Sequence, residues 1–69
     1  MYTNSRVTFF VKGNEQISLE AMFGSENETV TVSYQEKGMP FIRGFLYKTA
    51  IRHIESGNWN VVHVQPIVA

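Results

Sequence analysis

Three segments of the chain place apolar side chains at every second position, and this period of two constrains the fold more than any other feature. The segments are residues 6–11, 16–23 and 28–34. Successive side chains of a β-strand point to opposite faces, so alternation among β-branched and aromatic residues is typical of a strand with one buried face. The sequence therefore predicts three antiparallel strands in the first half of the chain.

The lengths of the two connections agree with this pattern, because a slip of one residue would turn the apolar side chains of a strand to solvent. Residues 12–14 form a suitable three-residue turn, which pairs Phe9 with Ile17. Residues 24–27 form a suitable four-residue turn, which pairs Ile17 with Tyr34. Both registers keep the apolar side chains on one face.

A further turn, residues 36–38, ends in a glycine at the left-handed third position. It returns a short fourth strand over residues 39–43. Pro40 cannot donate a hydrogen bond to a ladder, so we expect this strand at an edge of the sheet. The alternative is that Pro40 opens the helix that follows. We favour the strand, because Gly44 is an acceptable N-cap and no residue before Pro40 is.

The period changes to that of an amphipathic helix over residues 45–56, and Gly57 follows where a left-handed C-cap belongs. Residues 58–65 form a last strand, whose buried face the pattern leaves open. Because this strand follows a helix, we expect it to lie beside the first strand and to run parallel to it. The apolar arc of the helix consists of Leu46, Tyr47, Ala50, Ile51 and Ile54.

The resulting element order is β-β-β-(β)-α-β. The simplest arrangement is an α+β fold in which one small antiparallel or mixed sheet carries the helix on one face. We expect a single domain over residues 1–69. The chain has no cysteine, which excludes disulfides and thiolate zinc sites. Its stability must therefore come from core packing, helped by self-association.

Six basic and six acidic side chains cancel, so the chain has no general electrostatic attraction to nucleic acid or to acidic membranes. No apolar run approaches the roughly 18 residues of a membrane span. The first residues lack the charged-then-apolar order of a signal peptide. Together with the absence of cysteine, these features predict a cytoplasmic protein.

No motif for catalysis is recognisable in the sequence. It has no nucleophile elbow, no phosphate-binding glycine loop and no HExxH pattern. His53 and His63 are the only histidines, and a metal site would need at least one further ligand. We expect no catalytic residue, no metal and no cofactor, and hence no enzyme. A small-ligand or metal protein that uses the two histidines is a distant alternative.

The second face of the predicted sheet is the most informative anomaly, because it should be polar and carries apolar side chains. An uncovered apolar patch marks a partner surface, and aromatic and methionine side chains are enriched in interface cores. The alternative is that the termini or residues 35–43 fold back over this face. The predicted partner-binding residues are Phe10, Met22, Met39, Phe41 and Trp59.

These features favour a non-enzymatic protein-binding module that forms a homodimer through this face. Small, neutral, cysteine-free chains are typical of accessory proteins of phages and other mobile elements, many of which inhibit a host protein by occupying its surface. That analogy rests on size class and on no motif. The alternative is a domain that binds RNA or single-stranded nucleic acid by base stacking. It would use Phe10, Phe41, Arg43 and Trp59.

Overall fold

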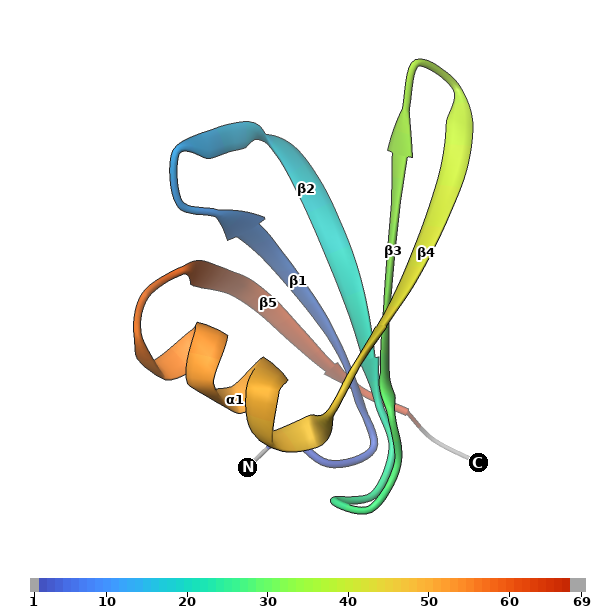
Figure 1. Cartoon of the computed structure of the whole chain (residues 1–69), viewed down its shortest axis with the longest axis vertical. Coiled ribbons are helices and arrows are strands. Elements are labelled where there is room, and N and C mark those ends of the chain that lie inside the picture. Colours follow the sequence, from blue (N-terminus) through green and yellow to red (C-terminus); the bar gives the residue numbers. More distant parts are fainter. Residues whose placement is uncertain (1, 68–69) are drawn as a thin grey trace.

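A computed structural model describes residues 2–67, which form one five-stranded antiparallel sheet and one helix (Figure 1). The strands lie in the order β4-β3-β2-β1-β5. The predicted fold class, a small α+β fold with one helix packed on one face of a sheet, is confirmed. The elements are β1 (Ser5–Val11), β2 (Asn14–Phe23), β3 (Val30–Glu36), β4 (Met39–Phe45), α1 (Tyr47–Glu55) and β5 (Trp59–Pro66).

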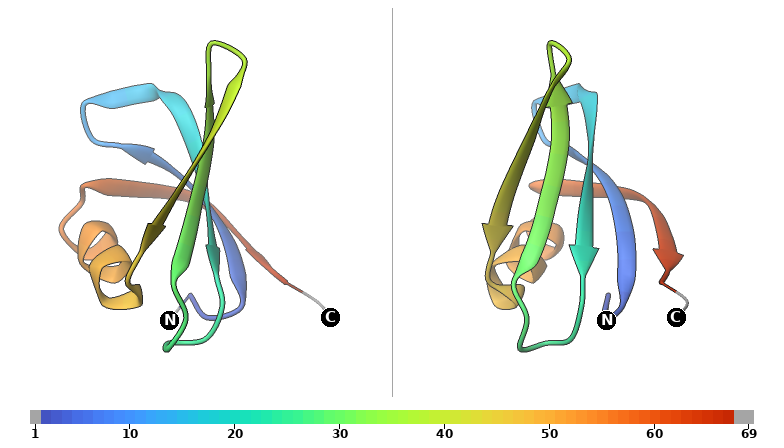
Figure 2. Two further views of the ribbon diagram at one scale, coloured as in Figure 1. Left: turned by 45° about the vertical axis from the view of Figure 1, so that its right-hand side comes forward. Right: turned by 90° about the vertical axis from the view of Figure 1, so that its right-hand side faces the viewer.

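The hydrophobic core lies between α1 and one face of the sheet, which we call the helix side (Figures 1 and 2). Phe9 of β1 is fully buried at its centre, and the ring of Trp59 stacks on it with the centroids 4.3 Å apart. Ala50 is the fully buried residue of the helix. The other core residues are Val7, Ala21, Phe23, Val30 and Val32, with Tyr47, Ile51 and Ile54 packed against them.

The helix is shorter than predicted. Gly44 and Phe45 belong to β4, and Leu46, in an extended conformation, occupies the N-cap position. Gly44 is therefore not the N-cap, and the side chain of Leu46 is 71% exposed rather than part of the apolar arc. The reason is that β4 stays paired with β3 as far as Phe45, which packs against the core. Within residues 2–67, no helix is long and apolar enough to cross a membrane.

The C-terminal end of the helix is as predicted, because Gly57 has a φ of 85°. The left-handed region is open to glycine without steric cost, so the chain can leave α1 there and turn back towards the sheet. The backbone N–H of Gly57 donates a hydrogen bond to the carbonyl of Ile54 at 3.2 Å, which satisfies one of the last free carbonyls of the helix.

The last strand lies beside β1 as predicted, but it runs antiparallel to β1. The chain reverses at each of three hairpin turns, so β4 runs opposite to β1. The helix carries the chain back along the sheet, and β5 then runs in the direction of β4. A parallel β5 would require three strands before the helix. The fourth strand, which the sequence left open, is present as β4, and it makes β5 run antiparallel to β1.

The predicted registers of the first two hairpins are wrong by an even number of residues. Phe9 pairs with Leu19 rather than with Ile17, because a register shift near the turn takes up extra residues of β2. The β2–β3 ladder ends before it reaches Ile17 and Tyr34. An even shift leaves every side chain on its predicted face.

The β3–β4 register is wrong by one residue, and this changes the faces of β4. The turn has two residues, Lys37 and Gly38, with φ of 54° and 79°. Two left-handed residues make the turn that best fits the twist of a two-residue hairpin. Tyr34 consequently pairs with Phe41, which places Phe41 on the helix side rather than on the outer face. Pro40 lies on an edge strand, as predicted.

Candidate functional site

The helix covers only one end of the sheet. Its nine residues are about 14 Å long, whereas the ten residues of β2 span roughly 33 Å. The part of β2, β3 and β4 towards the β3–β4 turn lies beyond the helix (Figure 1), and it carries apolar side chains on the helix side. We call these side chains the open-end patch. It consists of Ile17, Leu19, Tyr34, Met39 and Phe41.

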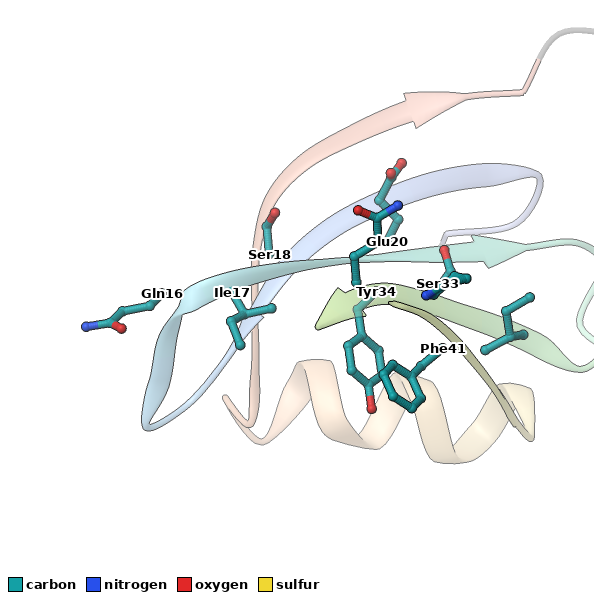
Figure 3. Close-up of a pocket in the computed structure, with 10 residues that line it drawn as sticks. Gln16, Ile17, Ser18, Glu20, Ser33, Tyr34 and Phe41 are labelled. Carbon is teal, nitrogen blue, oxygen red and sulfur yellow. The ribbon is translucent and has the colours of Figure 1, made fainter. Parts of the chain in front are cut away.

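Two aromatic rings form the centre of the open-end patch. The rings of Tyr34 and Phe41 stack with their centroids 5.2 Å apart, and Phe41 is 42% exposed. Figure 3 shows both rings and Ile17 on the side of the sheet where the helix lies, with Ser18 and Glu20 pointing to the other side. Met39, next to the turn, is 64% exposed. The patch is therefore an apolar surface in contact with solvent.

The two hairpins separate at this end of the molecule. The β2–β3 ladder contains only three pairs, the last of which joins Glu20 to Ser33. Beyond this pair the β3–β4 hairpin diverges from β1 and β2 (Figures 1 and 2). The gap is a hollow of about 560 Å³ with mixed polar and apolar walls (Figure 3). Its lining comprises Gln16, Ile17, Ser18, Glu20, Ser33, Tyr34, Gln35, Pro40, Phe41 and Ile42.

A second hollow, of about 300 Å³, lies deeper on the helix side. The guanidinium of Arg43 lies 5.2 Å from the centre of the Phe45 ring. His53 stacks on Trp59 with a centroid distance of 4.9 Å, and its Nδ1 lies 3.4 Å from Nδ2 of Asn58. The hollow is thus an aromatic pocket with one permanent cation at its wall. Its lining comprises Phe9, Val11, Leu19, Val32, Arg43, Phe45, His53 and Trp59.

The five predicted partner-binding residues do not share one surface. Phe10 and Met22 lie half-buried on the outer face. Met39 and Phe41 lie on the helix side, because the two-residue turn moves β4 by one position. Trp59 is only 6% exposed and belongs to the core. Its strand is apolar on both faces, so the pattern gave no orientation for it.

The outer face of the sheet is mostly polar, which contradicts the expectation of an apolar second face. Arg6 and Glu20 form an ion pair across it with a nitrogen–oxygen distance of 3.6 Å. Ile42, which is 74% exposed, is the apolar residue that the corrected register brings to this face. Phe10 and Met22 are further large apolar residues of this face. The polar remainder includes Thr8, Ser18, Thr31, Ser33, His63 and Gln65.

The residues of the nucleic-acid alternative are also dispersed. Phe10 lies on the outer face, Phe41 and Arg43 lie on the helix side, and Trp59 is buried. Base stacking by a sheet needs aromatic rings that are exposed on one surface. These four residues do not provide such a surface.

The two histidines lie on opposite faces. His63 pairs with Thr8 on the outer face, whereas His53 packs against Trp59 on the helix side. In the described part of the chain, no three His, Cys, Asp or Glu side chains are grouped as metal ligands. The exposed carboxylate of Glu15 accepts a hydrogen bond from the Gly13 N–H at 3.0 Å. This bond holds the pKa of Glu15 below its ordinary value.

Three residues of the open-end patch were missed as candidates from sequence, namely Ile17, Leu19 and Tyr34. The period of two places all three on the same face as Phe9 and Val32, so the sequence predicts them to be buried, and Leu19 does pack against the core. The signal that could have found them is length, since a nine-residue helix cannot cover a ten-residue strand from end to end. Comparisons with protein-family models, with curated proteins and with solved structures gave no match to this chain.

Proposed function

We propose that the protein is a non-enzymatic protein-binding module and that the open-end patch is its contact surface. The observation that carries this proposal is the stacked pair of half-buried Tyr34 and exposed Phe41 at the uncovered end of the sheet. A contiguous exposed apolar patch with polar surroundings marks an interaction site. Tyrosine, phenylalanine and methionine are among the residue types enriched in interface cores.

A protein partner fits this surface better than a nucleic acid does. The chain has a formal net charge of zero, whereas nucleic-acid binding draws most of its affinity from cations placed against phosphates. Arg43 lies over the ring of Phe45, and no basic residue belongs to the open-end patch itself. The patch therefore offers apolar contact area and no cluster of phosphate ligands.

Two finer statements belong to this proposal. The neutral charge removes a barrier to contact between copies, so we propose that the protein also self-associates. The mode of action we propose is inhibition, in which a small accessory protein of the phage type covers the surface of a cytoplasmic partner. This second statement rests on the analogy of size and composition given above.

The test uses a matched pair of substitutions on opposite faces. Phe41→Glu places a charge in the open-end patch, and Phe10→Glu places the same charge on the outer face. Tagged wild-type and variant proteins are used for affinity capture from lysate, with and without nuclease. We expect the wild type to capture a partner protein whether or not nuclease is present. The captured amount should fall at least tenfold with Phe41→Glu and stay unchanged with Phe10→Glu.

Each other outcome of this capture has a defined meaning. Loss with Phe10→Glu and retention with Phe41→Glu would move the contact surface to the outer face and contradict the proposal. Captured material that disappears on nuclease treatment would favour the nucleic-acid alternative, and its binding should then fall steeply with salt. Self-association is measured separately by sedimentation equilibrium on the same three proteins.

A further inference from the structure

The open gap between β2 and β3 begins where the next backbone pair of the ladder would form. The register of the last pair, Glu20 with Ser33, would bring Ser18 opposite Gln35 if the ladder continued. No such pair forms among residues 2–67, and both residues line the hollow instead. The two strands therefore open at this position.

The backbone groups of Gln35 point into this gap. In a two-residue hairpin the residues that flank the turn, here Glu36 and Met39, form a hydrogen-bonded pair. The next pair, Gln35 with Pro40, then has its backbone groups turned outward, which suits the missing N–H of proline. On the β3 side, outward means towards β2. The N–H and C=O of Gln35 thus face the gap.

The backbone groups of Ser18 face the same gap from the other strand. Ser33 has the same orientation as Gln35, because the orientation alternates along a strand. Glu20, the partner of Ser33, therefore directs its groups towards β3. Ser18 lies two residues from Glu20 and has the same orientation. Two N–H and two C=O groups consequently point into the hollow without a partner in the ladder.

The outer edges of the sheet are protected against pairing, whereas this inner gap is not. On β4, the missing N–H of Pro40 faces the free edge. On β5, the register shifts opposite Thr8 and Phe9, and the strand ends at Pro66. Bulges and prolines are common devices that prevent edge pairing. The backbone edges at Ser18 and Gln35 carry no such device.

We propose that the hollow between β2 and β3 receives an extended segment of a partner protein, which adds a strand to the open end of the sheet. This inference rests on the proposed function and specifies its binding mode. Addition of a strand supplies main-chain hydrogen bonds for affinity and side-chain contacts for specificity. An extended backbone is the ligand whose N–H and C=O groups match those of Ser18 and Gln35.

The two faces of the gap define the chemistry of the segment. Side chains of an inserted strand alternate between the two faces of the sheet. On the helix side they would contact Ile17, Tyr34 and Phe41 of the open-end patch, and on the outer face they would lie beside Ser18 and Ser33. The segment should therefore carry apolar side chains at every second position and polar ones between them.

The experiment selects ligands from a library of displayed random linear nonapeptides and then measures one selected synthetic peptide by calorimetry and amide hydrogen exchange. We expect the selected peptides to alternate apolar and polar residues. Binding should slow exchange of the Ser18 and Gln35 amides at least tenfold. Gln35→Pro removes an N–H that faces the gap and should weaken binding at least tenfold. The matched control, Gly44→Pro, removes an N–H on the free edge of β4 at a residue outside the lining of the hollow, and it should change affinity less than threefold.

Several results would contradict the addition of a strand, and each has a separate meaning for the open-end patch. Binding that Phe41→Glu abolishes, with no added protection at Ser18 and Gln35, would keep the patch as the contact surface and exclude strand addition. Loss with Gly44→Pro alone would move pairing to the β4 edge. The Ser18 and Gln35 amides could also become protected without peptide as the protein concentration increases. A second copy of the chain would then be the occupant of the hollow. If no peptide is selected, strand addition is contradicted. The proposed function is still tested separately by the capture experiment.

A variant that fails to fold does not remove the test. Backbone spectra of Gln35→Pro and Gly44→Pro show whether each retains the native fold. If Gln35→Pro does not, the exchange of the Ser18 and Gln35 amides in the wild-type complex decides alone.

Discussion

The helix covers one part of the sheet and leaves another part uncovered. The covered side chains stabilise the fold, and we propose that the uncovered ones bind a partner. At the closed end, α1 lies over the sheet, and Phe9, Val7 and Phe23 are fully buried. At the open end, β2 and β3 part, and Tyr34 and Phe41 stack on each other with solvent above them. Both ends use aromatic side chains on the same face, so residue type does not distinguish them.

The difference teaches that the length of the covering element decides which apolar side chains become core. A side chain such as Leu19 follows the same period as Phe9 and lies opposite it in the ladder. Leu19 is nevertheless only half-buried, because it lies near the limit of the area covered by α1. Substitutions at the two ends should therefore have very different effects on folding, and the predictions below run from the largest to the smallest.

The largest effect is expected from truncation of an aromatic side chain that the helix covers. Trp59→Ala removes a ring that stacks on both Phe9 and His53. Loss of a buried aromatic costs about 3–5 kcal/mol of unfolding free energy. A chain of 69 residues has roughly 3–10 kcal/mol in total, so this variant should be largely unfolded. The matched open-end variant, Tyr34→Ala, should cost about 1 kcal/mol. Urea unfolding of both compares them, and equal losses would contradict the distinction between the ends.

A smaller effect is expected at the β3–β4 turn, which sets the register of the open end. Gly38 has a φ of 79° and no atom within 4 Å of an added Cβ, so Gly38→Ala tests backbone strain alone. Left-handed alanine costs about 1–2 kcal/mol. Lys37, with a φ of 54°, should gain about 0.5–1 kcal/mol on change to Asn, which tolerates this conformation. The two substitutions should shift the midpoint of urea unfolding in opposite directions. A shift in the same direction would argue for a different turn.

A still smaller effect is expected on the outer face, from the ion pair of Arg6 and Glu20. Both side chains are about half exposed, and their nitrogen and oxygen lie 3.6 Å apart. Exposed pairs of this kind contribute about 0.2–1 kcal/mol and are screened by salt. Glu20→Gln should therefore lower stability slightly at low salt and have no effect at high salt. A loss that persists in 1 M salt would mean that Glu20 stabilises the fold by another contact.

The smallest effect is expected from Glu15 at the β1–β2 turn, because this carboxyl is exposed. The Gly13 N–H lowers the pKa of Glu15 below the ordinary value of an exposed carboxyl, so the folded state favours the charged form. Its contribution is present above the pKa of the unfolded chain and is lost as the pH falls through the lower folded value. A carbon-detected titration should give a midpoint for Glu15 below that of an ordinary exposed glutamate in the wild type. The same titration in urea, where the turn is unfolded, should give the ordinary midpoint, and equal midpoints in the two states would exclude the hydrogen bonds of the turn as the cause.

Much of the fold was predictable because local patterns specify the strands and the helix directly. Alternation identified β1, β2 and β3, Pro40 placed β4 at an edge, and Gly57 ended the helix. The direction of β5 was missed, because it depends on the number of strands before the helix. That number was uncertain as long as Pro40 could also have opened the helix.

The candidate site was less predictable, because it depends on one residue of register in β4. A three-residue turn sends Phe41 to the outer face, and the observed two-residue turn sends it to the helix side. The sequence Glu-Lys-Gly permits both turns. Gly38 is suited to the left-handed region in either turn, and Lys37 gives no strong signal for or against that region. Trp59 was misplaced for a related reason, since an alternating pattern is missing from its strand.

The opening between β2 and β3 is the central claim, and amide hydrogen exchange of the free protein at low concentration tests it most directly. The last closed pair, Glu20 and Ser33, should exchange slowly, whereas Ser18 and Gln35 should exchange at rates close to those of an exposed chain. Slow exchange at Ser18 and Gln35, equal to that at Glu20 and Ser33, would show that the ladder is closed. The inserted strand would then have no free backbone groups to pair with.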